Sequence, residues 1–468
     1  MSSTLTTQTE AAPDVRQNDN EKAPRLQLTN TAILAGACAV LLLGPLAFGA
    51  VEPWSIFALE ACAMLLLAVW AFRQWMNREI NVFGNPLYGP MAAFLALVLA
   101  QWVFGATAYR HVTYSHLLLY AAYAMLAFVV TQTLRRSSQF EFMALLFTGY
   151  GALVASFAVL QGLAPNGKLY WVRALEAGGA IYGPYVNHNH YAGLMELLVP
   201  FPLVLAATRF TDGGRKIAVA GIAALMAASI FLSGTRGGMA AFVAQMVVLT
   251  VLLARKRKHG WKQPLMLGAF LAAVILFLIW VGGNGLTERL VSIHSEAREE
   301  ISGGVRLTID RDCLRMLLKR PILGWGLGTF PIVYPEFRSF YTTFFVNQAH
   351  NDYLQLLVET GLAGFSIAAW FMVLVFRRGA SKLKDWTETA SGTLTVAALL
   401  GCLGILVHSF LDFNLQIPAN AALFYVLCAI AASAPLHESQ RRRVARRRNL
   451  IVQPNLEAGT LPTETPAP

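Results

Sequence analysis

The sequence predicts an all-α integral membrane protein with about twelve transmembrane helices and one long outer loop. Three observations support this fold class. Of the 468 residues, 56% are hydrophobic and only 13% are charged, whereas soluble domains carry roughly 25% charged residues. Apolar runs of about 20 residues, enough to cross the hydrocarbon core of a bilayer, recur along the chain. Basic residues alternate regularly between the segments that join these runs.

The predicted spans form one membrane domain over residues 29–434, with a long outer loop at 283–349. In chain order, the apolar runs cover residues 31–51, 55–74, 86–105, 114–134, 141–163, 190–208, 216–233, 237–254, 264–282, 351–376, 391–411 and 418–434. Residues 1–28 are predicted to be a disordered cytoplasmic tail, so the first run is expected to be a retained span and not a cleaved signal peptide. Residues 435–468 are basic and then rich in proline and threonine, and we expect a second disordered cytoplasmic tail there.

The distribution of lysine and arginine predicts the orientation of these spans, because positively charged loops stay on the cytoplasmic side. With a cytoplasmic N-terminus, the inner segments hold 25 of the 37 basic residues. Eight of the others lie in the long outer loop, so the short outer loops share only Arg110, Lys168, Arg173 and Arg236. The net charge of +11 is therefore explained by topology, and no nucleic-acid partner is expected.

The long outer loop has a helical pattern of its own. The stretch GVRLTIDRDCLRMLLKRP, residues 304–321, interleaves apolar and basic residues, and Pro321 ends it. This pattern predicts an amphipathic helix that lies on the outer leaflet. The following ILGWGLGTF is rich in glycine, and we expect a re-entrant or packed loop there.

Polar side chains gather at the outer ends of several predicted spans, in the stretches GPYVNHNHYAG, SGTRGG, QAHNDYLQ and HSFLDFNLQIP. The candidate functional residues on this face are Arg110, His188, His190, Arg236, Arg306, His350, Asn351 and Asp412. Because they lie far apart in the sequence but at one predicted face, they are candidates for a common site.

Each candidate also has a purely structural interpretation. Arg236 could extend its guanidinium among lipid head groups, and His188 and His190 could bind loop carbonyls at the interface. The two histidines could also ligate a metal ion, but no carboxylate–histidine cluster accompanies them, and the five cysteines have no metal-type spacing. We therefore expect no metal ion and no cofactor. Glu60 and Glu196 fall within predicted spans, where an ionisable group is costly and often functional.

The combination of these residue types indicates a chemistry. Arg110, Arg236 and Arg306 face the outer leaflet against the general charge bias, and guanidinium groups bind phosphate oxygens in a bidentate manner. A histidine such as His350 could accept a proton from a hydroxyl at neutral pH. Together they suit a lipid diphosphate that leaves as an acceptor hydroxyl attacks, with arginines stabilising the growing negative charge.

Three segments resemble, in order and spacing, the O-antigen ligase and polymerase family: SGTRGG, Arg306 with the downstream PILGWGLGTF, and HNDYLQLLVETGLAGF. The resemblance covers about residues 180–430, and NHNHYAG and HSFLDFNLQIP are similar to members that polymerise surface or exopolysaccharide. It implies a fold like that of C-class membrane glycosyltransferases. It also implies an inverting, metal-independent transfer of an undecaprenyl-diphosphate-linked glycan on the periplasmic face of the bacterial inner membrane.

The same resemblance implies roles for individual residues. Arg236 and Arg306 match the arginines that bind the donor diphosphate, and His350 matches the histidine that activates the acceptor or positions the donor. Asn351, Gln355 and Glu359 continue the matching helix as supports.

Further matches imply contacts with substrate. Asn351 continues the histidine motif, and Asp412 fits a recurring acidic position in the next outer segment. Arg110, His188 and His190 match loosely and are candidates for binding sugar or lipid.

The acceptor separates the alternatives that remain. If it is the next lipid-linked repeat unit, the chain is a polymerase, which the NHNH and LDFNLQIP segments favour; if it is lipid A–core, the chain is a ligase. The expected partners are the lipid-linked oligosaccharide donor, a glycan acceptor and membrane lipids, with a chain-length regulator as a further candidate. A transporter of a small anion or lipid-linked sugar is the alternative from another class, and it should show repeated halves and interrupted helices near the midplane. A non-catalytic assembly protein is the third.

Overall fold

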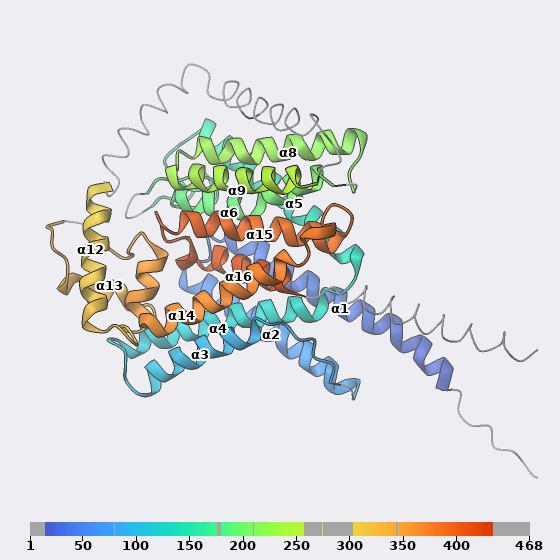
Figure 1. Ribbon diagram of the computed structural model, residues 1–468, viewed down its shortest axis with the longest axis horizontal. Coiled ribbons are helices and arrows are strands. Elements are labelled where there is room, and N and C mark those ends of the chain that lie inside the picture. The colour runs from blue at the N-terminus through green and yellow to red at the C-terminus, as the bar shows by residue number, and fades with distance from the viewer. Residues whose placement is uncertain are drawn as a thin grey trace, which may run out of the picture.

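The computed structural model describes residues 15–78, 80–175, 179–208, 210–256, 274, 303–342 and 345–433. Within these ranges the chain is helical and contains no β-strand (Figure 1), which confirms the predicted all-α class. The helices are α1 (Val15–Leu46), α2 (Pro53–Met76), α3 (Tyr88–Val103), α4 (Arg110–Thr133), α5 (Ser137–Leu163), α6 (His188–Leu198), α7 (Pro200–Ala206), α8 (Gly213–Leu232), α9 (Arg236–Ala254), α12 (Gly303–Lys319), α13 (Phe330–Val333), α14 (Asp352–Ala380), α15 (Ala390–His408) and α16 (Pro418–Ala432), with short 3-10 helices at Tyr334–Glu336, Leu383–Asp385 and Asn414–Gln416.

Eight of the described helices are long and apolar enough to cross a membrane: α1 from Leu28 onward, α2, α4, α5, α8, α9, α14 and α15. Helices α3 and α16 are apolar but shorter. The predicted span at 190–208 is divided into α6 and α7, because Pro200 cannot donate the hydrogen bond that would continue α6. Apart from residue 274, the predicted span at 264–282 lies outside the described residues, so the total of twelve stays a prediction.

The N-terminal helix covers part of the segment predicted to be a tail, and the tail itself stays a prediction. Helix α1 begins at Val15, whereas the sequence predicts disorder up to residue 28. Residues 1–14 and 434–468, which include half of the predicted N-terminal tail and all of the predicted C-terminal tail, lie outside the described residues.

The core of the bundle is formed by α6, α7, α15 and α16. Every residue of α6 after His188 is buried, and nearly all of α16 is buried as well. Figure 1 shows α15 and α16 within the bundle, with the longer helices α4, α8 and α14 around them. Polar residues on α6 or α15 are therefore inside the protein and away from lipid.

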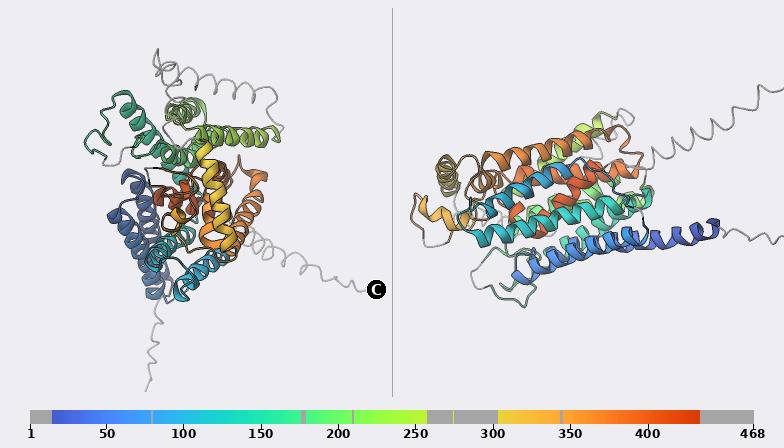
Figure 2. Two further views of the ribbon diagram at one scale, coloured as in Figure 1. Left: turned by 90° about the vertical axis from the view of Figure 1, so that its left-hand side faces the viewer. Right: turned by 90° about the horizontal axis from the view of Figure 1, so that it is seen from below.

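Helix α12 lies across one end of the bundle, nearly perpendicular to the other helices, and the start of α1 lies at the opposite end (Figures 1 and 2). One face of α12 buries Ile309, Cys313 and Met316 in a small core of its own. On another face Leu307 and Leu318 are 61% and 78% exposed. The amphipathic helix expected within 304–321 is thus present, and the predicted outer-leaflet location stays a prediction.

The glycine-rich loop after α12 packs against a kink in α14. At Gly361 the backbone leaves the helical conformation, with φ 64° and ψ −168°, so the N–H groups of Leu362 and Ala363 donate to the carbonyls of Pro321 and Ile322 at 2.8 and 3.1 Å. A Cβ at Gly361 would fall 2.2 Å from the Ile322 oxygen, so this position requires glycine. The loop and the start of α14 therefore form one unit.

Candidate active site

His350 stands directly before α14, at the end of the bundle that carries α12. Its backbone has φ 54°, a strained value for a residue other than glycine. The side chain of Asn351 caps α14 by accepting hydrogen bonds from the N–H groups of Tyr353 and Leu354, both at 3.2 Å. Gln355 accepts a hydrogen bond from the Ala349 N–H at 2.9 Å. These bonds fix the backbone on both sides of the imidazole, which is 13% exposed.

Asp412 lies beside this imidazole. Its Oδ1 is 3.4 Å from Nδ1 of His350, which is ion-pair range although the angle falls outside hydrogen-bond geometry. Burial alone would raise the pKa of the Asp412 carboxyl, but His350 and, farther off, His190 and His408 lower that pKa well below its ordinary range. An ionised carboxylate next to Nδ1 favours the tautomer protonated there, so Nε2 is left as the proton acceptor.

The segment that carries Asp412 is attached to α14 by Asp352, for which the sequence predicts no role. The Asp352 carboxylate accepts hydrogen bonds from the Ser409 hydroxyl at 2.8 Å and from the Leu415 N–H at 3.2 Å. Its own N–H donates to the Ser409 carbonyl at 2.9 Å. Because Asp352 lies two residues after His350, these bonds set the separation of the His350–Asp412 pair.

Helix α12 brings Arg306 and Asp310 to the same place. Nη1 of Arg306 donates to the Leu411 carbonyl at 2.7 Å, one residue before Asp412. Burial raises the pKa of the Asp310 carboxyl, although Asn351, Arg306 and His350 act in the opposite direction. Asp310 is a further residue that the sequence did not single out, because an acidic residue on an amphipathic helix is usually solvated.

Arg236 is the first residue of α9 and is exposed. It forms no hydrogen bond or ion pair with any residue that the structure describes. The next residue, Gly237, packs against the His408 ring at the end of α15. Arg236 therefore stands at the edge of the cluster with an uncommitted guanidinium.

The two histidines of the NHNH stretch have different surroundings. Nδ1 of His188 lies 2.8 Å from the Ser233 carbonyl, as its structural interpretation predicts, and so joins this stretch to the SGTRGG turn. His190 is buried, and its ring meets Phe413 edge-on at 4.8 Å, while the ring of His350 meets the same Phe413 at 4.9 Å. His190 thus lines the inner side of the cluster, and His188 lies at its rim.

Arg110 is separate from this cluster. Its guanidinium donates to the carbonyls of Trp102 and Val103 in its own α3–α4 turn, at 3.1 and 3.2 Å, and lies 5.9 Å from the Trp102 ring. None of the contacts described for Arg110 reaches the other candidates. Among the described residues, no group of three or more histidine, cysteine or acidic side chains is arranged to hold a metal ion.

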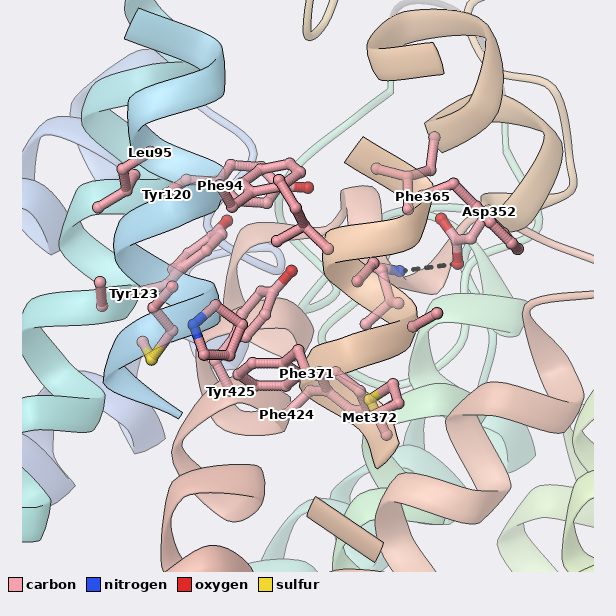
Figure 3. Close-up of a pocket in the computed structure, with 18 of the residues that line it drawn as sticks. Phe94, Leu95, Tyr120, Tyr123, Asp352, Phe365, Phe371, Met372, Phe424 and Tyr425 are labelled. Atoms are coloured by element: carbon pink, nitrogen blue, oxygen red, sulfur yellow. Dashed lines mark hydrogen bonds between the residues drawn. The ribbon is translucent and has the colours of Figure 1, made fainter. Parts of the chain in front are cut away.

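A cavity of about 320 Å³ lies beside the cluster, between α3, α4, α14 and α16. Its lining is almost entirely apolar, with eight aromatic side chains, and Asp352 lies at one of its walls. Figure 3 shows Tyr120 and Tyr123 on one side of this space and Asp352 on the other, with Phe371, Phe424 and Tyr425 below. Such a lining, apolar with few polar groups, suits a hydrocarbon ligand.

Residues 221–369 match the family model described as O-antigen ligase. This match supports the O-antigen ligase and polymerase family. It runs from α8 through the glycine-rich loop into α14, so it contains Arg236, Arg306 and His350, whereas His188, His190 and Asp412 lie outside it. The family indicates a glycan ligase or polymerase activity, which is a transferase reaction, on lipid-linked substrates in a membrane. No curated protein matches this chain.

Proposed function

We propose that this chain transfers a glycan from undecaprenyl diphosphate to a sugar hydroxyl on the periplasmic face of the bacterial inner membrane. In this proposal it polymerises the repeat units of a surface polysaccharide. One observation carries the proposal. His350, Asp412 and Arg306 come from three separate segments, yet they meet at the end of the bundle that α12 crosses, next to the α9 turn with Arg236.

The arrangement supports a direct displacement. The acceptor oxygen attacks the anomeric carbon of the donor sugar from the side opposite the diphosphate, so the new C–O bond forms as the bond to the diphosphate oxygen breaks and the configuration inverts. Nε2 of His350 takes the proton of the attacking hydroxyl, and the Asp412 carboxylate stabilises the imidazolium. Arg306 and Arg236 stabilise the negative charge that develops on the leaving undecaprenyl diphosphate.

The carrier lipid fits the same arrangement. The aromatic cavity begins beside Asp352, two residues from His350, and continues along α14 as far as Met372. A prenyl chain in this cavity would direct its diphosphate toward the start of α14. We include this contact in the proposal because it gives the hydrocarbon part of the donor an apolar site adjacent to the charged one.

The transporter hypothesis is less well supported. The break between α6 and α7 is the kind of interruption that a transporter would use. However, Leu197, Leu198, Val199 and Phe201 at this break are fully buried, so apolar packing fills it. The unusual polar groups gather instead at one end of the bundle, as a surface reaction requires.

The test is to extract surface glycans and lipid-linked intermediates from a deletion strain complemented with wild type or His350→Ala. Single repeat units that accumulate on undecaprenyl diphosphate in the variant would identify a polymerase. Long polymer that stays on the carrier, with bare lipid A–core, would identify a ligase, which the description of the matching family favours. His111→Ala, an exposed histidine on α4, is the matched control. Normal glycan from His350→Ala at normal membrane abundance would refute the catalytic role.

A further inference from the structure

His408, the last residue of α15, connects several parts of the candidate site. Its Nδ1 lies 2.7 Å from Oε1 of Glu196 on α6, and the two side chains are 1% and 0% exposed. Its backbone carbonyl accepts hydrogen bonds from the N–H groups of Leu411 and Asp412 at 2.8 and 3.1 Å. The Leu411 carbonyl in turn accepts the hydrogen bond from Arg306. One residue therefore links α6 to the segment after α15. This segment contains Asp412 and accepts the hydrogen bond of Arg306.

The other edge of the His408 ring lies against the start of α9. A Cβ at Gly237 would fall 2.4 Å from Cδ2 and 2.5 Å from Nε2 of His408, and no such contact is tolerated without a shift. Gly237 directly follows Arg236. The glycine after the arginine in SGTRGG therefore has a physical explanation, because it leaves room for an imidazole that reaches the first turn of α9.

A second contact ties α9 to the same helices. Gln245 donates hydrogen bonds to the carbonyls of Glu196 and Leu400, at 2.7 and 3.0 Å. Thus α6, α9 and α15 are joined at two levels by buried polar groups. A buried ion pair is weak evidence for stability, because apolar residues of similar volume often stabilise a core as well or better. Stability alone therefore does not account for Glu196 and His408.

We propose that the Glu196–His408 pair is a positioning element that sets the start of α9 relative to the end of α15. This inference rests on the proposed function. Glu196 accepts the hydrogen bond of Nδ1 and so orients the ring. The ring then fixes the distance from Arg236 to the segment after α15, which contains Asp412 and binds Arg306. Neither Glu196 nor His408 contacts the substrate. Without the pair, the two arginines would no longer meet one diphosphate, and a misplacement of about 1 Å can cost on the order of 100-fold in rate.

The close approach of Gly237 to His408 provides a direct test. The full chain is purified into lipid nanodiscs, and its affinity for undecaprenyl diphosphate is measured for wild type, Gly237→Ala, His408→Ala and the double variant. Gly221→Ala on α8 is the matched control, since a Cβ there meets no atom within 4 Å. Each affinity is expressed per folded molecule, from the amplitude of the thermal unfolding transition.

We expect Gly237→Ala to weaken binding about tenfold in the wild-type background but less than twofold when His408 is alanine, because the clashing ring is gone. Gly221→Ala should bind as wild type does. The inference would be overturned if the double variant lost as much affinity as the two single variants lose together.

A second pair of variants separates positioning from fold maintenance. Glu196→Gln can still accept the hydrogen bond of the imidazole, so it should bind within about threefold of wild type, whereas Glu196→Leu should lose at least tenfold, by the same positional argument. If the folded fraction of Glu196→Leu binds like wild type, the pair is merely structural. If wild type itself binds no undecaprenyl diphosphate, the proposed function fails as well. If wild type binds undecaprenyl diphosphate and Gly237→Ala binds it equally well, only the positioning role is refuted.

Discussion

Asp412→Asn is the sharpest perturbation of the candidate site, because it removes a charge and preserves the shape. The amide oxygen can keep the hydrogen bond that Oδ1 accepts from the Phe413 N–H at 2.8 Å. What is lost is the attraction between the carboxylate and an imidazolium 3.4 Å away. At this range a charge pair in a medium of effective dielectric about 20 is worth roughly 5 kcal/mol. If the amide dipole restores part of this, about 2–3 kcal/mol of transition-state stabilisation is lost, or roughly 30- to 150-fold in kcat.

This loss should appear in kcat and leave KM for the donor nearly unchanged, since the imidazolium forms only as the hydroxyl proton is transferred. The assay is single-turnover transfer from a lipid-linked repeat unit in nanodiscs. The folded fraction must be measured as well. The depressed pKa of Asp412 means that its charge stabilises the folded chain at neutral pH. This contribution is complete above the ordinary carboxyl pKa and is lost as pH falls from there through the folded-state pKa.

A double-mutant cycle decides whether Asp412 acts through His350. In the His350→Ala background, Asp412→Asn should cost less than about threefold further. The reasoning would be refuted if the two losses multiplied, or if Asp412→Asn alone kept kcat within threefold of wild type.

Three further predictions concern residues with contrasting surroundings. Glu359→Gln should lower the unfolding temperature and leave kcat per folded molecule unchanged, because the buried carboxylate accepts two backbone N–H groups of the glycine-rich loop. The amide has only one oxygen to accept them, at a cost of about 1–3 kcal/mol; calorimetry measures this. Arg306→Lys should weaken undecaprenyl diphosphate binding about tenfold by titration, since an ammonium cannot bond both Leu411 and a phosphate in a fork. Arg236→Ala should weaken the same binding about tenfold without changing the unfolding temperature, whereas Arg110→Ala should leave binding unchanged; the opposite pattern would reject both assignments.

The sequence predicted that the candidate residues gather at one end of the spans. This prediction needs only the hydropathy and charge of each segment, which can be read one segment at a time. It did not predict the bonds between segments. Asp352 binds the Ser409–Leu415 stretch, and Glu196 binds His408 across more than 200 residues of sequence. His408 opens the stretch HSFLDFNLQIP, which the sequence marks as polar, but nothing in that stretch indicates a partner on α6 or α9. Its role becomes visible only when α6, α9 and α15 are packed together.

The histidine motif shows the same division. In HNDYLQLLVETGLAGF, most of the polar residues support the backbone: Asn351 caps α14, Gln355 holds Ala349, and Glu359 holds the glycine-rich loop. His350 alone of these directs its ring toward Asp412. The resemblance predicted supporting roles for Gln355 and Glu359, and these hydrogen bonds give that prediction a physical basis that the spacing could not provide.

The arginines of the predicted outer segments show why charge bias alone does not identify a site. Arg110 binds carbonyls of its own turn, and Arg173 pairs with Glu52 at 2.6 Å, so the partners described for both lie outside the candidate site. Arg306 instead crosses to the Leu411 carbonyl, and Arg236 forms no hydrogen bond within the described part of the chain. The guanidinium of Arg236 is thus available for an anion, and that of Arg306 lies beside the buried carboxylate–imidazole pair. The useful signal is therefore the partner that each arginine has in the folded chain.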